Sequence, residues 1–251
     1  MIRFLLVLVA IGALIWFAAS RIPLGMALNQ APLSGMGIQW TQSEGTIWDG
    51  RMSGVYVNGQ PVGDIDLALR PASLLTLSPA VEVQWGGAGG RGAGVVTLKG
   101  DVIEATDLRV EQQVSALESL SNELRAIGGI VRLSGGSVRI ENNACTQASG
   151  QVQTDTLTRA ALQFGREFSD LSGNISCVDG AFNLLMNGSS PAGDTMKIDA
   201  DASLQGASNI DITVNTSDND IQMLLAQAGF AQRDGVWTYE YDITQRAGDA
   251  Q

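Results

Sequence analysis

The chain has 251 residues, a formal net charge of −11 and no histidine. A chain of this length can bury a substantial apolar core without metals or many disulfides. The acidic balance argues against nucleic acid and anionic lipid head groups as partners of its surface as a whole. The lack of histidine removes the commonest general base and the commonest metal ligand, so Ser-His-Asp chemistry and a zinc site are excluded.

An uncharged apolar run, Phe4–Ala19, lies near the N-terminus between two arginines. Its length is close to the lower limit of about 17 residues for a helix that crosses a bilayer. The pair Trp16-Phe17 is typical of an interfacial anchor, and Ala18-Ala19-Ser20 is weaker support for a cleaved signal peptide. We predict an uncleaved transmembrane signal anchor over residues 1–22, which would leave the rest of the chain outside the cytoplasm.

From Gln39 onward, apolar and polar residues alternate with a period of two, and Gly, Asn, Asp or Pro interrupt the pattern about every ten residues. This pattern is typical of antiparallel strands with one apolar and one polar face, and it predicts a mainly β fold. We expect a linker over residues 23–38, a β-rich domain over residues 39–246 and a tail over residues 247–251. The apolar positions of the later strands are Val81, Val83 and Trp85; Val96 and Leu98; Val131 and Leu133; Val138 and Ile140; Phe182, Leu184 and Met186; Met196, Ile198 and Ala200; Ile210, Ile212 and Val214; Trp237, Tyr239 and Tyr241.

The stretch Ser43–Gly50 is predicted as the first strand of a hairpin that runs from about Gly45 to Arg70. In an extended chain Trp48, Met52 and Tyr56 share one apolar face, and Asp49 points the other way. Asn58-Gly59 supplies the two-residue turn that matches the twist of the strands.

One or two short helices are expected. Apolar residues at helical spacing predict a helix from Val114 to Ile127 that ends at Gly128-Gly129. A shorter helix is predicted from about Asp220 to Ala228, with the segment Asp218–Asp220 as its cap. Residues 157–168 are compatible with a helix, but Gly165 leaves the segment ambiguous.

No constellation in the chain predicts catalysis. Asp199 and Asp201 project from one side of a predicted strand, and their alternation with apolar residues favours a solvated polar face over a catalytic carboxylate pair. The glycine tract Gly86–Gly92 lacks the Lys-Ser ending of a phosphate-binding loop and is predicted to be a hairpin loop. We expect no cofactor and no metal.

The chain contains two cysteines, Cys145 and Cys177. In an oxidising compartment a lone pair of cysteines more often forms a disulfide than stays reduced, so we predict a Cys145–Cys177 bond. The alternative is two buried thiols.

Two short motifs follow the apolar N-terminal run: Gly45-Thr46 with Trp48 and Gly50, and Pro71 with Leu74-Leu75. In this order they resemble the N subunit of bacterial type II secretion systems. The similarity continues through residues 171–180 and 224–230, so it spans most of the chain.

The resemblance implies a non-enzymatic subunit anchored in the bacterial inner membrane by a single helix, with its β-rich domain in the periplasm. The subunit would belong to the apparatus that exports folded proteins across the outer membrane and would contact other subunits of it. Trp48, Trp85 and Trp237 are candidate contact residues, because aromatic side chains concentrate at interfaces. The alternative is that all three belong to the core.

The same layout is similar to that of AsmA-type proteins, whose curved sheets are associated with lipid handling. This likeness implies a curved antiparallel sheet, half-barrel or taco-like, along whose open apolar groove phospholipid would bind. Phospholipid is therefore a second candidate partner beside other secretion subunits.

Overall fold

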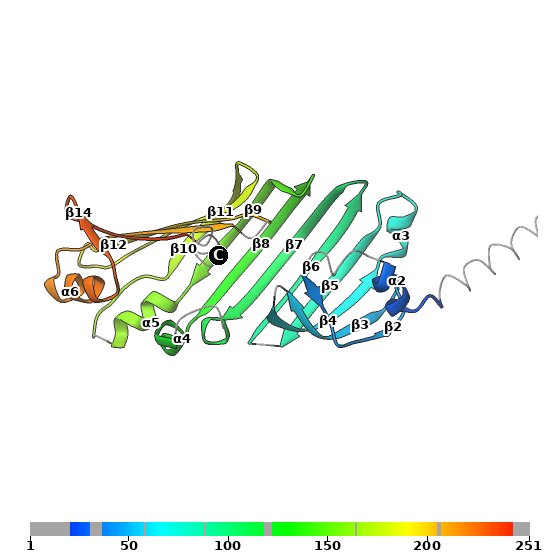
Figure 1. Cartoon of the computed structure of the whole chain (residues 1–251), viewed down its shortest axis with the longest axis horizontal. Helices are drawn as coiled ribbons and strands as arrows, with labels where there is room; N and C mark the ends of the chain where they lie inside the picture. The colour runs from blue at the N-terminus through cyan, green and yellow to red at the C-terminus, as the bar shows by residue number, and fades with distance from the viewer. Residues whose placement is uncertain are drawn as a thin grey trace, which may run out of the picture. The chain divides into compact units, whose positions relative to one another are not determined.

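The structure, a computed structural model, describes residues 21–30, 37–57, 59–87, 89–117, 122–163, 165–204 and 207–242. It consists mainly of antiparallel strands with a few short helices, which confirms the prediction of a mainly β, antiparallel fold (Figure 1). The chain divides into two compact units, unit 1 over residues 1–97 and unit 2 over residues 98–251, and each is described by itself.

The predicted anchor, Phe4–Ala19, lies outside the described residues. Within the part of the chain that the structure describes, none of the helices combines the length and the apolar character needed to span a bilayer.

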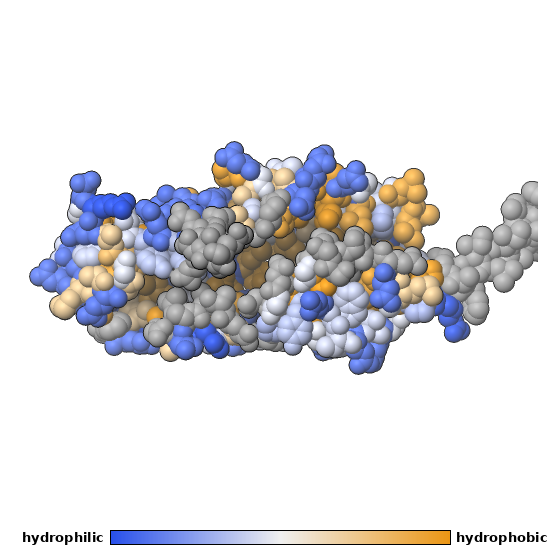
Figure 2. Space-filling view, in the orientation of Figure 1, coloured by the Kyte–Doolittle hydropathy of each residue, from blue (hydrophilic) through white to orange (hydrophobic). Residues whose placement is uncertain are grey.

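In unit 1 one face of an antiparallel sheet is covered by a short helix. Both β1 and β2 pair with β3, and β3 to β6 pair in chain order. Leu24 and Leu28 pack from the helix onto Met52 and Val55 and form the core. The elements are α2 (Leu24–Gln30), β1 (Ile38–Gln39), β2 (Gln42–Gly45), β3 (Gly50–Val57), β4 (Gln60–Leu69), α3 (Pro71–Leu74), β5 (Ala80–Gly87) and β6 (Gly90–Lys99). Figure 2 shows hydrophobic residues gathered over α3.

Within the stretch Ser43–Gly50, residues 46–49 form a hairpin turn between the end of β2 and the start of β3, so the prediction of one continuous strand is wrong. Gly45 pairs with Gly50, and the amide of Thr46 donates to the carbonyl of Asp49 at 2.9 Å. Gly45 has φ +80°, and a Cβ there would approach the Asp49 carbonyl oxygen to 2.4 Å. The loop therefore removes Trp48 from the strand face on which alternation placed it.

An irregularity in β3 separates Met52 from Tyr56. The register between β3 and β4 shifts between Met52 and Val55 and again between Val55 and Tyr56. An extra residue in one strand inverts the alternation that follows it. Met52 is therefore buried, Tyr56 is exposed, and Val55 is the residue that turns inward with 1% exposure. The prediction that Met52 and Tyr56 share a face is wrong for this reason.

In unit 2, strands β7 to β13 pair antiparallel in chain order, β15 joins β13, and β14 joins β15. Val152, Leu171 and Met186 are buried together, and Leu157 packs against them. The elements are β7 (Val102–Gln113), η2 (Val114–Ala116), α4 (Asn122–Ile127), β8 (Ile130–Glu141), β9 (Ala144–Thr154), α5 (Thr156–Gln163), β10 (Leu171–Val178), β11 (Ala181–Ser189), β12 (Thr195–Ala202), β13 (Ser208–Asn215), α6 (Asn219–Gln227), β14 (Ala231–Arg233) and β15 (Val236–Asp242).

The helices of unit 2 match the predictions unevenly. The short helix α6 is confirmed, and Gly229 with φ +89° follows it. The ambiguous segment contains α5. The helix expected from Val114 to Ile127 is wrong at its start, where a 3₁₀ turn, η2, stands. Among the described residues of that range, only α4 is α-helical.

The Asn58-Gly59 hairpin is confirmed, since Val57 pairs with Gln60. The glycine tract forms a turn as well, but a tighter one than expected. Gly87 pairs with Gly90, so most of the tract lies within β5 and β6.

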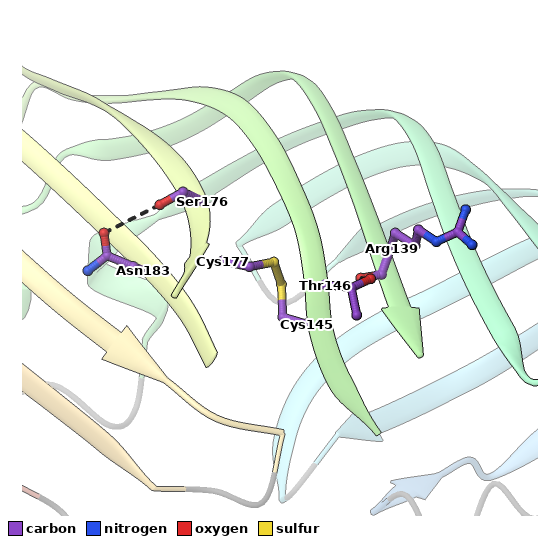
Figure 3. The surroundings of a disulfide bond; sticks show 6 residues. All are labelled: Arg139, Cys145, Thr146, Ser176, Cys177 and Asn183. Atoms are coloured by element: carbon purple, nitrogen blue, oxygen red, sulfur yellow. Dashed lines mark hydrogen bonds between the residues drawn. A yellow bond between two sulfur atoms is a disulfide. The ribbon is translucent and has the colours of Figure 1, made fainter. Parts of the chain in front are cut away.

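A disulfide joins Cys145 of β9 to Cys177 of β10, with 5.6 Å between the Cα atoms (Figure 3). The β9–β10 ladder extends from Leu171 to Asn174 of β10, and the amide of Cys145 donates to the Gly180 carbonyl at 2.9 Å. The bond therefore links the two strands where their regular pairing gives way to the β10–β11 turn.

Reducing the disulfide is expected to destabilise the protein. The two cysteines are 32 residues apart, and the chain-entropy model gives about 3–4 kcal/mol for a loop of that size. Urea unfolding of the full chain, followed by circular dichroism with and without a phosphine reductant, measures the effect. The Cys145→Ala/Cys177→Ala variant serves as control, and its unfolding midpoint should not change when the reductant is added. An unchanged midpoint in wild-type protein with both thiols free would contradict this expectation.

Gly173 is expected to be irreplaceable in β10. A Cβ there would lie 1.8 Å from the carbonyl oxygen of Leu185, a backbone atom that cannot rotate away, so Gly173→Ala should cost at least about 3 kcal/mol. The matched control is Gly86→Ala in β5, where a Cβ meets no atom within 4 Å and the change should be neutral or stabilising by up to about 1 kcal/mol. Urea unfolding gives both free energies, and equal values for the two variants would refute the steric argument.

Candidate functional site

Unit 2 contains an apolar cleft of about 490 Å³ between α5 and α6, over strands β12 and β13. Figure 1 draws the two helices at the same end of unit 2. Residues 166–168, which follow α5, form part of the wall. The apolar lining consists of Leu157, Ala160, Ala161, Phe168, Met196, Val214, Ile221, Met223, Leu224 and Leu225.

The N-terminal cap of α6 positions one wall of the cleft. The Asp218 carboxylate Oδ1 accepts hydrogen bonds from the amides of Asp220 at 2.9 Å and Ile221 at 3.2 Å. This cap fixes the first turn, so that Ile221, Leu224 and Leu225 follow at helical spacing on the side of the cleft. The Ile221 amide above all, with the Arg166 guanidinium in addition, holds the pKa of Asp218 below the ordinary value of 3.8 against the opposing effect of burial.

Arg166 ties the two walls together. Its Nη1 donates to Asp218 Oδ2, and its Nη2 lies 3.4 Å from Asp220 Oδ2. The segment after α5 is thus held to the first turn of α6. Because all three side chains are partly exposed, the ion pairs serve position more than stability.

A buried carboxylate supports the floor of the cleft. Asp194 is 7% exposed. Its Oδ1 accepts from the Thr216 hydroxyl at 2.7 Å and its Oδ2 from the Ser190 hydroxyl at 2.8 Å. These bonds satisfy the carboxylate and fasten the turn between β11 and β12 to the end of β13.

The three tryptophans predicted as contact residues lie in two units. Trp237 of unit 2 is buried opposite Val214, and its indole N–H has no acceptor among the described residues. Trp48 and Trp85 of unit 1 are half-buried. Trp85 lies across Gly92, where a Cβ would come within 2.1 Å of its ring. A contact role for Trp48 and Trp85 remains a prediction.

The first motif contacts the segment Pro23-Leu24 at the start of the described chain. It consists of Gly45, Thr46, Trp48 and Gly50. Thr46 pairs with Pro23, and its hydroxyl accepts from the Trp48 amide at 3.3 Å. A Cβ on Gly50 would lie 2.7 Å from a methyl carbon of Leu24, so glycine lets α2 approach the turn.

The second motif, Pro71, Leu74 and Leu75, forms α3 and the residue after it. Leu75 is 88% exposed. This motif therefore contributes surface rather than core.

The carboxylates weighed as a catalytic pair are part of a polar strand face. Asn183 Nδ2 donates to Asp199 at 2.8 Å and to Asp201 at 2.9 Å, so one amide holds both. In the described ranges, no three His, Cys, Asp or Glu side chains gather as a metal site. The described geometry is that of an antiparallel β-sheet protein with an apolar cleft.

The family follows from the sequence match. Residues 36–239 match the model of type II secretion system protein N, and because this range covers most of the chain, the protein belongs to that family. It is thus a component of the type II secretion machinery. No curated protein and no solved structure matches the chain.

The sequence predicted the N-terminal cap of α6 but not the cleft beside that helix. Asp218 was expected to begin a helix, whereas Arg166 and Asp194 carried no local signal. Of the two helices that wall the cleft, the sequence predicted α6 and left the segment of α5 ambiguous. Which sheet face they cover depends on long-range pairing.

The negative charge of Asp218 should stabilise the folded protein at neutral pH and stop doing so at acidic pH. Because its folded-state pKa lies below 3.8, the stabilisation is present above that value and is lost as pH falls through the folded-state pKa. Asp218→Asn keeps a capping acceptor but removes the ion pair. Wild-type protein should therefore be more stable than this variant at about pH 7 and have a smaller advantage at about pH 2.5, where the Asp218 carboxylate begins to be protonated in the folded state as well. Urea unfolding at both pH values measures it, with Asp101→Asn, at an exposed aspartate of the same unit, as control for charge. An advantage of equal size at both pH values would contradict the assignment.

Proposed function

We propose that the protein is a non-enzymatic subunit of the type II secretion system, held in the inner membrane by Phe4–Ala19 with both units in the periplasm. Family membership supports the machine. The apolar run supports the anchor. The Cys145–Cys177 disulfide supports an oxidising compartment such as the periplasm.

The cleft between α5 and α6 is the docking site of this proposal, and its apolar lining is the observation that carries it. Met223 and Leu224 stand at the cleft with 58% and 41% exposure. Large side chains left exposed beside an apolar hollow mark an interaction site. Two methionines, Met196 and Met223, make the lining adaptable to the shape of a partner.

The charges at the cleft favour a protein segment with basic residues. Glu167 and Asp220 are exposed at its rim, Asp194 lies in its floor, and Arg166 is engaged by Asp218 and Asp220. The whole chain carries a net charge of −11. A segment of another secretion subunit that presents two or three apolar side chains beside a Lys or Arg would match both the lining and the charge.

Phospholipid is the second candidate occupant. A cleft of about 490 Å³ is within the range of about 300–1,000 Å³ typical of small-molecule sites, and its lining suits an acyl chain. The acidic rim disfavours an anionic head group, so the subunit contact is the better supported of the two.

Photocrosslinking in cells separates the two occupants. A photoreactive amino acid in place of Leu224 should yield an adduct with another secretion subunit, identified by mass spectrometry. The matched control is Ala226, which is exposed on the same helix but does not line the cleft. Leu224→Asp should weaken the contact about tenfold or more, since it removes an apolar anchor, while Ala226→Asp should not. A lipid adduct would favour the second candidate, and identical patterns at 224 and 226 would contradict a docking role for the cleft.

A further inference from the structure

The connection between β4 and β5 in unit 1 carries three exposed leucines. Leu74, Leu75 and Leu77 are 41%, 88% and 90% exposed. They stand on α3 and the turn that follows it, where Figure 2 shows hydrophobic surface. The segment Pro71–Pro79 contains no charged residue. We name Leu74, Leu75 and Leu77 the leucine tip.

Hydrogen bonds hold the leucine tip in place. The Ser73 hydroxyl donates to the Arg70 carbonyl at 2.6 Å and accepts from the Ala80 amide at 2.8 Å. The Leu77 amide donates to the Leu74 carbonyl at 3.2 Å, and Leu77 has φ 53°, a left-handed conformation that is unfavourable for leucine. The leucines are therefore presented to the outside by a built turn that retains backbone strain.

The leucine tip lies at the end of unit 1 where the chain enters the sheet. The Ile22 carbonyl accepts from the Ile47 amide at 3.2 Å, and the Ile47 carbonyl accepts from the Leu69 amide at 3.3 Å. Leu69 ends β4 directly before the segment that carries the tip. Figure 1 draws α2 and α3 at the same end of unit 1.

The short distance along the chain from Ala19 to Ile22 brings this end to the membrane. Ala19 is the last residue of the apolar run, and three residues in extended form span at most about 11 Å. The polar region of each leaflet is about 5–8 Å thick. With Phe4–Ala19 in the bilayer, Ile22 lies in or beside the head-group layer. Leu69, which two hydrogen bonds link to Ile22 through Ile47, then starts the segment that carries the tip close to the same layer.

We infer that the leucine tip is a second membrane contact, inserted among the lipids of the bilayer that holds the anchor. The inference rests on the proposed inner-membrane anchor. The uncharged tip is not repelled by head groups, and apolar side chains that insert below the head groups add to membrane binding. One anchor leaves unit 1 free to swivel, whereas two contacts fix its orientation on the bilayer.

Depth-dependent fluorescence quenching tests the contact on the full chain. Both native cysteines are in the disulfide, so Leu75→Cys or Leu77→Cys supplies the thiol that takes an environment-sensitive fluorophore. The labelled chain is reconstituted into phosphatidylethanolamine–phosphatidylglycerol vesicles with spin-labelled acyl chains. The matched control is Tyr56→Cys, 42% exposed in the same unit but near the far end of β3, about 20 Å from Gly50.

We expect blue-shifted emission and strong loss of fluorescence to the quencher at positions 75 and 77, and neither at position 56. Flotation of the vesicles on a density gradient reports the anchor separately. If the chain floats with the vesicles but labels 75 and 77 stay unquenched, the proposed membrane contact of the leucine tip is wrong and the anchor stands. A chain that does not float would overturn the anchor and the tip together.

Discussion

The apolar face of an open antiparallel sheet must be covered, and the rest of this structure depends on how that is done. In unit 1 the helix α2, with Leu24 and Leu28, lies on Met52 and Val55. In unit 2, Leu157 of α5 packs against the buried cluster of Val152, Leu171 and Met186, while α6 lines the neighbouring cleft. The helices have 7, 8 and 9 residues, so they cover their sheets only in part. The cleft between α5 and α6 is the uncovered remainder.

Helices this short are not stable alone, because the free-energy cost of nucleating a helix exceeds the stabilisation that two or three turns provide. They persist here because side chains fasten their ends to the sheets. Asp218 caps α6 and binds Arg166 from the segment after α5. Asp155, directly before α5, accepts from the Ile130 amide of β8 at 2.7 Å and from Arg159 at 2.8 Å. The walls of the cleft are therefore defined by a few polar contacts, which is why a mainly apolar lining is framed by charged residues.

Glycine-rich sequences account for the places where alternation failed. A period of two predicts a strand only while the chain stays extended and the ladder stays regular. Gly45 and Gly50 instead close a turn around Trp48, and a bulge beside Gly54, with φ +60°, inverts the face of the residues that follow. Both events depend on what lies opposite: the carbonyl of Asp49, a methyl group of Leu24 and the register of β4. The contacts with Leu24 and with β4 have no signature within the stretch itself.

The sequence by itself determined what local interactions decide. Alternation predicted the strands, Asn58-Gly59 the hairpin, Asp218 and Gly229 the limits of α6, and the short motifs the type II secretion family. These features arise among residues a few positions apart, so they can be inferred before any pairing is known. Only the tertiary structure decided that Val55 turns inward, that Asp194 and Arg166 frame a cleft, and that Leu75 and Leu77 are left outside. Those outcomes depend on groups far apart in the chain, because strand pairing and helix docking bring Ile22 beside Ile47 and Arg166 beside Asp218.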